Sequence, residues 1–330
     1  MDIIRKIFAV VVLVAIVSCA NAVERPVYPC HRLAPAPVID GELDDEAWKT
    51  IPEATGFFIF PESKNIYYAV EKQTFFKAGW TEDAIYLAIR AKENAPEKLI
   101  ANGKDGEDLW MDDSIELFFF PTGTPDYTQL IASSAGSRWN GRGKNVADVM
   151  GWEAKTVVGK TEWVLELRIP FAVLAAKAPK EGDEWPVNVA RNLLTGPAEE
   201  RCTCWPPLRT GFHDVANFGR FVFKGKAGNN IAAEENELTR AYIQYMQGEI
   251  RQLDGLAGKY EKDLAEAQKS EKQCAEAENL LQAWAKVVTL AALADPGCRE
   301  LMAARISNVN LTERSDDCVV KMMMERLFKE

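Results

Sequence analysis

The chain has 330 residues, enough for one large domain or two smaller ones. Hydrophobic residues make up 47% of it and charged residues 27%, which excludes a wholly disordered chain. The formal net charge of −10 comes without a basic stripe, so nucleic acid is excluded as an expected partner.

The chain begins with the features of a secretion signal. Two basic residues precede an apolar run over 7–17 that is too short to span a bilayer comfortably. Cleavage after Ala22, at a small-x-small site, competes with cleavage at a lipobox that ends in Cys19. We therefore expect a signal peptide over 1–22 and an exported protein, which is periplasmic, secreted, or an outer-membrane lipoprotein anchored through Cys19.

Export would place the cysteines in an oxidising compartment, where disulfides form. Six remain if Cys19 is removed: Cys30, Cys202, Cys204, Cys274, Cys298 and Cys318. Cys30 could bridge to Cys202 or Cys204, and a pair among the last three could join helices, but the sequence leaves the connectivity open. A zinc site built from Cys202, Cys204 and His213 is a weaker alternative, because that spacing matches no common zinc pattern.

Between residues 23 and 223 the pattern is that of short β-strands. The proline-rich stretch over 23–37 is predicted to be extended, and Asp44 is a candidate cap for a helical turn that buries Trp48. Hairpins are predicted over 74–91 and 152–169, further strands over 114–120, 127–134, 185–192 and 218–223, a mobile glycine-rich loop over 136–143, and a short helix over 170–176. Many short strands with little intervening helix predict an antiparallel β-sandwich.

The stretch from Glu107 to Phe120 carries the strongest signal for a binding site. Trp110 lies in a loop that leads directly into the strand over 114–120. Strand alternation puts Ile115, Leu117 and Phe119 on one face, and Glu116 among aromatic residues on the other. A carboxylate beside an indole suits a site that stacks the apolar face of a flat ligand and hydrogen-bonds its hydroxyls.

The composition changes over 224–230, a stretch rich in glycine and lysine that is predicted to be a linker. Beyond it, apolar residues recur every three or four positions from 238 to 264 and again from 280 to 291, which predicts amphipathic helices. Two more helices are predicted over 298–307 and 313–328. The chain would thus consist of a sandwich over 23–225 and an α-helical hairpin or bundle over 226–330. These helices could pack on themselves or on the sandwich, or form a coiled coil with a partner helix or a second copy.

Several ordered motifs resemble those of family 9 carbohydrate-binding modules. They are Val38-Ile39-Asp40-Gly41 with Ala47-Trp48, Ala78-Gly79-Trp80-Thr81-Glu82-Asp83, Trp110-x-x-Asp113-Ser114-Ile115-Glu116, and Trp205 followed by His213-Asp214-x-x-x-Phe218-Gly219. The ordered set is more specific than any one motif. The resemblance covers residues 38–223 and does not reach the helices.

The resemblance implies a non-catalytic sandwich of the jelly-roll or immunoglobulin-like type that holds the end of a sugar chain between two tryptophans. By position, Trp110 and Trp205 would be the two platforms, and Glu116 would be the carboxylate that binds sugar hydroxyls. Gln129, where the family tends to present an arginine, and Asn188 would complete the polar set. The expected partner is a poly- or oligosaccharide, bound alongside a glycoside hydrolase in carbohydrate catabolism.

The resemblance also implies that structural calcium is an option, although no cofactor is required. Asp112 and Asp113 are its candidate ligands, with Asp126 as a further one, but no ordered Asp/Asn loop like that of an EF-hand is present.

Two other classes of function stay open. A glycoside hydrolase needs two carboxyl groups about 5–10 Å apart, for which Glu116 and Asp113 are the candidate pair. A haem-binding electron-transfer domain needs axial ligands, for which His31, His213 and Met111 are the candidates.

Overall fold

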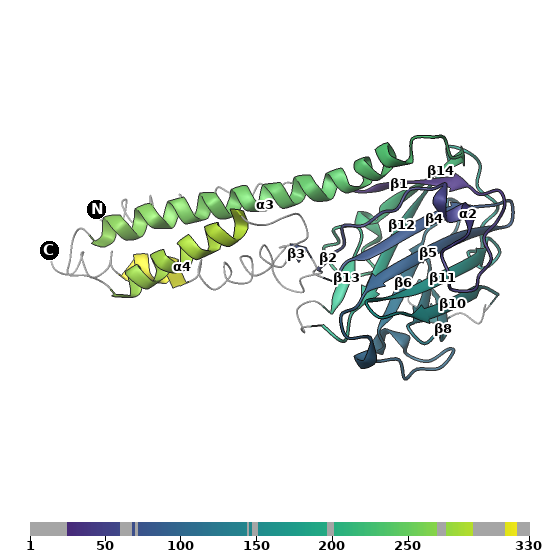
Figure 1. Ribbon diagram of the computed structural model, residues 1–330, viewed down its shortest axis with the longest axis horizontal. Coiled ribbons are helices and arrows are strands. Elements are labelled where there is room, and N and C mark those ends of the chain that lie inside the picture. The colour runs from purple at the N-terminus through teal and green to yellow at the C-terminus, as the bar shows by residue number, and fades with distance from the viewer. Residues whose placement is uncertain are drawn as a thin grey trace.

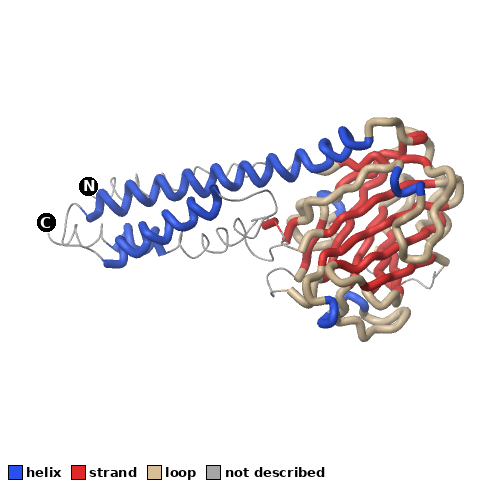
Figure 2. The backbone as a smooth tube through the Cα atoms, viewed as in Figure 1, coloured by secondary structure: helices blue, strands red, loops and turns tan. Residues whose placement is uncertain are grey.

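Strands and helices occupy separate parts of the molecule. A β-sandwich forms one part, and a long helix extends from it and is joined by a second helix (Figures 1 and 2). The computed structural model describes residues 25–59, 68–69, 72–143, 145–146, 151–196, 201–268, 275–292 and 314–321. The predicted signal peptide lies outside the described residues.

The described strands run in chain order along the first two thirds of the sequence. They are β1 (Val27–Arg32), β2 (Phe58–Ile59), β3 (Tyr68–Ala69), β4 (Thr74–Trp80), β5 (Ala84–Lys92), β6 (Ser114–Phe119), β7 (Thr128–Ser133), β8 (Arg138–Arg142), β9 (Asn145–Val146), β10 (Glu153–Val158), β11 (Glu162–Pro170), β12 (Glu184–Asn192), β13 (Cys202–Cys204) and β14 (Gly219–Lys226).

The strands form one continuous hydrogen-bonded path that folds over into a nearly closed sandwich. The order is β10-β11-β5-β4-β1-β14-β12-β6-β7-β8-β9, with β13 on β12, β2 on β13, and β3 on β2. Among the described strands, the only parallel pairings are those of β1 with β4 and with β14. The predicted sandwich is therefore confirmed, and the proline-rich stretch contributes the strand that connects its two halves.

Alternation along the strands builds the core, as predicted. Ile115, Leu117 and Phe119 of β6 point into the interior, where they join inward residues of the opposite half, such as Leu87 and Leu165. Each such apolar side chain stabilises the fold by about 1.5–3 kcal/mol relative to an exposed one.

Two local predictions are wrong. Part of the glycine-rich stretch over 136–143 is a strand, β8, because Trp139 fits a buried place beside Ile131. Gly141 permits this, since a Cβ atom there would lie 2.5 Å from the Trp139 ring. A helix over 170–176 is not formed: Pro170 ends β11, residues 171–175 form successive turns, and Ala175 ends them with a φ of 52°.

A buried carboxylate on β11 holds the N-terminal motif in place. Glu166 accepts hydrogen bonds from the Trp48 indole (2.7 Å) and from the backbone N–H groups of Asp40 (3.0 Å) and Gly41 (2.7 Å). Burial raises the pKa of Glu166, and these bonds oppose the rise. Trp48 lies in the short helix α2 (Glu46–Lys49), as predicted, but its N-cap is Asp45 rather than Asp44.

The helical part is built on α3 (Ile231–Gln268) and α4 (Ala275–Ala292), which pack against each other. The rings of Tyr260 and Trp284 stack with centroids 5.2 Å apart. A further helix over 314–321 joins them, because the Trp284 indole donates to Ser315 and the Tyr260 hydroxyl donates to Asp316. The helix predicted over 298–307 lies outside the described residues. No helix among the described residues is both long and apolar enough to cross a membrane.

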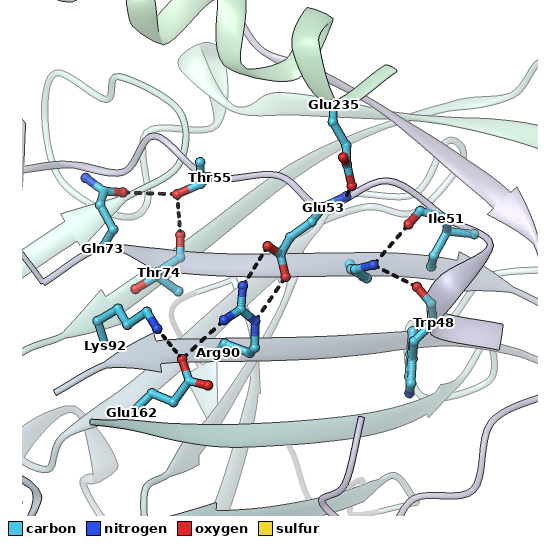
Figure 3. A network of polar contacts seen from close by, with 11 residues as sticks. Trp48, Ile51, Glu53, Thr55, Gln73, Thr74, Arg90, Lys92, Glu162 and Glu235 are labelled. Carbon is cyan, nitrogen blue, oxygen red and sulfur yellow. Dashed lines mark hydrogen bonds and ion pairs between the residues drawn. The ribbon is translucent and has the colours of Figure 1, made fainter. Parts of the chain in front are cut away.

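The first turns of α3 are fixed to the sandwich by polar contacts. His31 of β1 lies between the Gly225 carbonyl oxygen (3.2 Å from Nδ1) and the Glu234 carboxylate (2.9 Å from Nε2). The Glu235 carboxylate accepts the Glu53 backbone N–H at 3.0 Å. Glu53 in turn begins an ion-pair chain on the outer face of the sheet, through Arg90 (Figure 3).

That chain continues across two strands. Arg90 and Lys92 of β5 both pair with Glu162 of β11, at 3.2 and 2.7 Å (Figure 3). An apolar contact lies further along α3, where the Tyr242 ring packs on Phe58, with centroids 5.4 Å apart. α3 is therefore connected to the sandwich through His31 of β1, through the ion-pair chain that reaches β5 and β11, and through Phe58 of β2.

Neither of the two bridges considered for Cys30, to Cys202 or to Cys204, is formed. Cys30 is a free thiol in the sandwich interior, whereas Cys204 is a free thiol that packs in a separate cluster with Phe118 and Leu208. Burial raises the pKa of both thiols, that of Cys204 to about 12. Cys274 and Cys298 lie outside the described residues, so a bridge among the last three cysteines stays a prediction.

Candidate functional site

Polar side chains of three adjacent strands meet around one carboxylate on the outward face of the sheet. Glu116 of β6 accepts a hydrogen bond from Gln129 of β7 (Nε2 to Oε2, 2.7 Å) and another from Asn192 of β12 (Nδ2 to Oε1, 2.7 Å). Asn192 also lies within hydrogen-bond distance of Ser114 Oγ, at 3.0 Å. The alternation of β6 that buries Ile115 and Leu117 in the core places Ser114 and Glu116 here.

Burial dominates the electrostatics of this group. Only 4% of Glu116 is exposed. Burial raises the pKa of its carboxyl group, and the hydrogen bonds from Asn192 and Gln129 oppose the rise. Each carboxylate oxygen uses one lone pair for an amide and keeps another for a further donor. The site can therefore hydrogen-bond a ligand that brings hydroxyl or amine groups.

Aromatic residues flank the carboxylate on one side. Glu116, Ile131 and Trp139 are in register across β6, β7 and β8, so the Trp139 backbone lies two strands, about 10 Å, from that of Glu116. Trp110 meets the buried Trp139 edge to face, with centroids 5.9 Å apart, and remains 40% exposed. Trp110 is thus an indole that a ligand can reach.

Asp112 and Asp113 shape the loop that carries Trp110. Asp112 accepts backbone N–H groups of Asn102 and Gly103, both at 3.0 Å. Asp113 accepts those of Ile100 (2.8 Å) and Leu194 (2.9 Å). N–H donors therefore face both carboxylates, which does not suit a cation site.

The calcium hypothesis gains no support from this arrangement. Within the described ranges, no three His, Cys, Asp or Glu side chains are grouped so that they could hold a metal ion, which also applies to Cys202, Cys204 and His213.

Asn188 is not brought to Glu116. Asn188 lies on β12 two residues from Ala190, the partner of Glu116; it is in register with Phe118 and is fully buried. Its amide donates to the Phe212 carbonyl at 3.1 Å, and Phe212, His213 and Phe218 cover Phe118. The loop after β13 therefore covers this end of the face.

Trp205 is not a second platform in this structure, which corrects the expected grip between two tryptophans. Its backbone N–H bonds the Val189 carbonyl (2.9 Å), so the ladder begun by Cys204 and Ala190 continues and the ring points inward. There it packs against Tyr28, Phe76 and Phe221 and is 1% exposed. A fully enclosed ring cannot stack on a ligand.

The geometry disfavours the two alternative functions. Asp113 is fully buried and its two carboxylate oxygens accept the backbone N–H groups of Ile100 and Leu194, whereas Glu116 is held by the side chains of Gln129 and Asn192. The two carboxylates therefore do not flank a common substrate. The candidate haem ligands are dispersed: His31 lies against α3, His213 bonds Tyr127 at 2.6 Å, and Met111 is exposed.

Three residues of the site were missed as site candidates from the sequence. Strand alternation predicts that Asn192 points to the same face of its strand as Asn188, and Ser114 to the same face as Glu116, so the sequence does contain a signal for both. The glycine-rich pattern predicts a loop at Trp139, so the sequence does not show that Trp139 lies in register with Glu116.

Together, the fold and the site define a β-sandwich with a polar, aromatic-flanked face and a helical extension. The sequence profile of the family described as "Carbohydrate family 9 binding domain-like" matches residues 39–226, more than half of the chain, and the protein belongs to this family. The resemblance found in the sequence motifs is thereby confirmed.

A comparison with solved structures finds three matches of low sequence identity. A family 9 carbohydrate-binding module of Caldicellulosiruptor kristjanssonii in complex with cellotriose is 18% identical, with a TM-score of 0.45 over 62% of this chain and 96% of that one. A module with the same description in complex with glucose is 17% identical, with a TM-score of 0.46 over 61% of this chain and 98% of that one. A candidate carbohydrate-binding protein of Bacteroides uniformis is 18% identical, with a TM-score of 0.49 over 61% of this chain and 100% of that one. A search of curated protein sequences finds no significant match.

Proposed function

We propose that this chain binds a sugar, without chemistry, on the face formed by Glu116, Gln129 and Asn192 beside Trp110. Family membership supports carbohydrate as the ligand class. The observation that carries the proposal is the outward-facing carboxylate, held by two amides and flanked by an accessible indole. Carboxylate and amide groups bind vicinal hydroxyls, and the C–H face of a pyranose stacks on an indole.

The grip we propose differs from one between two tryptophans. Trp110 supplies the only large exposed aromatic surface among the described residues, and Trp139 supports it from behind. Affinity would then rest on one stacking face plus the polar floor around Glu116.

Calorimetric titration with a panel of neutral mono- and oligosaccharides tests the proposal. Trp110→Ala should weaken binding about tenfold, because stacking is worth about 1 kcal/mol or somewhat more. Met111→Ala is the matched control, since Met111 is the neighbouring residue and is 65% exposed. Equal loss in both variants, or no binding by the wild type, would contradict the proposed site.

The same proposal includes export and a role beside polysaccharide-degrading enzymes. The basic and apolar N-terminal residues support export. The helical extension could serve to associate the chain with such an enzyme or with a second copy.

A further inference from the structure

Glu116 is a buried carboxylate without an opposite charge beside it. Its two partners, Gln129 and Asn192, are neutral amides, and no lysine or arginine of the described chain forms an ion pair with it. Glu93 provides the contrast within this molecule: it is equally buried, but Lys72 pairs with it at 2.7 Å and Arg191 lies at 3.7 Å.

An uncompensated buried charge is costly, and a ligand that neutralises it recovers that cost. A sugar hydroxyl offers Glu116 a hydrogen bond but no charge. A uronate would add a second negative charge. An ammonium group offers both the hydrogen bond and the opposite charge, and such charge-assisted bonds are about twice as strong as neutral ones.

We propose that the preferred ligand is an amino sugar, a hexosamine unit with a free amine whose ammonium group pairs with Glu116. This inference rests on the proposed function, because it specifies the chemical class of sugar bound on that face.

The test compares three β-1,4-linked trimers of glucosamine, N-acetylglucosamine and glucose, titrated calorimetrically into the full chain near neutral pH. The first two differ by an acetyl group that removes the charge of the amine. The glucosamine trimer should bind at least about tenfold tighter than either of the others. Equal or weaker binding overturns the inference, while binding of the glucose trimer keeps the proposed function. Failure of all three to bind overturns both.

Two variants locate the preference. Glu116→Gln removes the charge, and Gln129→Arg gives Glu116 a cation of its own; each should bring the affinity for the glucosamine trimer down to that for the glucose trimer. Thermal unfolding shows whether each variant is folded. If one of them does not fold, the other still tests the role of Glu116. A preference that survives in both folded variants overturns the assignment to Glu116.

The overall charge of −10 could attract any cation, so the wild type is also titrated in about 1 M salt, where the screening length is about 3 Å. A preference that persists there supports a local ion pair. A preference that vanishes overturns it.

Discussion

At the residue scale, Glu116 should make the stability of the protein depend on pH. Folding raises the pKa of its carboxyl group above the usual 4.5, so the folded chain holds this proton more tightly than the unfolded chain. The contribution to stability is therefore complete below about pH 4.5 and is lost as the pH rises through the folded-state pKa. Glu116→Gln cannot ionise at this position, so it should reduce this decline and be the more stable of the two proteins at neutral pH.

Urea unfolding over a pH series measures the effect. Glu42→Gln is the control, because Glu42 is exposed in the loop before α2 and its replacement should leave the decline unchanged. If the Glu116→Gln variant loses stability with pH as steeply as the wild type, this carboxyl group is not the source.

At the element scale, the packing of α3 against the sandwich depends on Tyr242. Its ring packs on Phe58 and closely against Gly56, where a Cβ atom would lie 2.8 Å from the tyrosine. Tyr242→Ala leaves a cavity at this contact and should cost about 2–4 kcal/mol. Hydrogen exchange should become faster in the first turns of α3, by more than the drop in the free energy of unfolding of the whole protein accounts for.

Arg240→Ala is the matched control for this helix. Arg240 is exposed and pairs only with Glu237 of the same helix among the contacts described, so its loss should cost no more than about 0.5 kcal/mol. Equal exchange rates in the two variants would show that the Tyr242 contact does not hold the helix.

At the scale of the whole molecule, periodicity predicted more than motif position did. Alternation correctly assigned Ile115 and Glu116 to opposite faces of β6, and helical spacing correctly predicted that Tyr260 and Trp284 would be buried. Position within a motif failed for Trp205, because its direction depends on the backbone bond to Val189, a long-range pairing that spacing does not encode. The same limit applies to Trp139, because its strand β8 is formed by pairing with β7 and β9, which the local glycine-rich pattern does not encode.

The length of α3 leads to a prediction about cooperativity. Tyr242 contacts the sandwich, and Tyr260 stacks on Trp284 about 27 Å further along the helix axis. Trp284→Ala removes that stack and the bond to Ser315, at a local cost of about 3–5 kcal/mol. Hydrogen exchange should accelerate in α4 and in 314–321 while the strands β5 and β6 keep their protection, as they should in the exposed-site control Val320→Ala. Equal loss of protection in the strands would mean that the sandwich and the distal helices unfold as one cooperative unit.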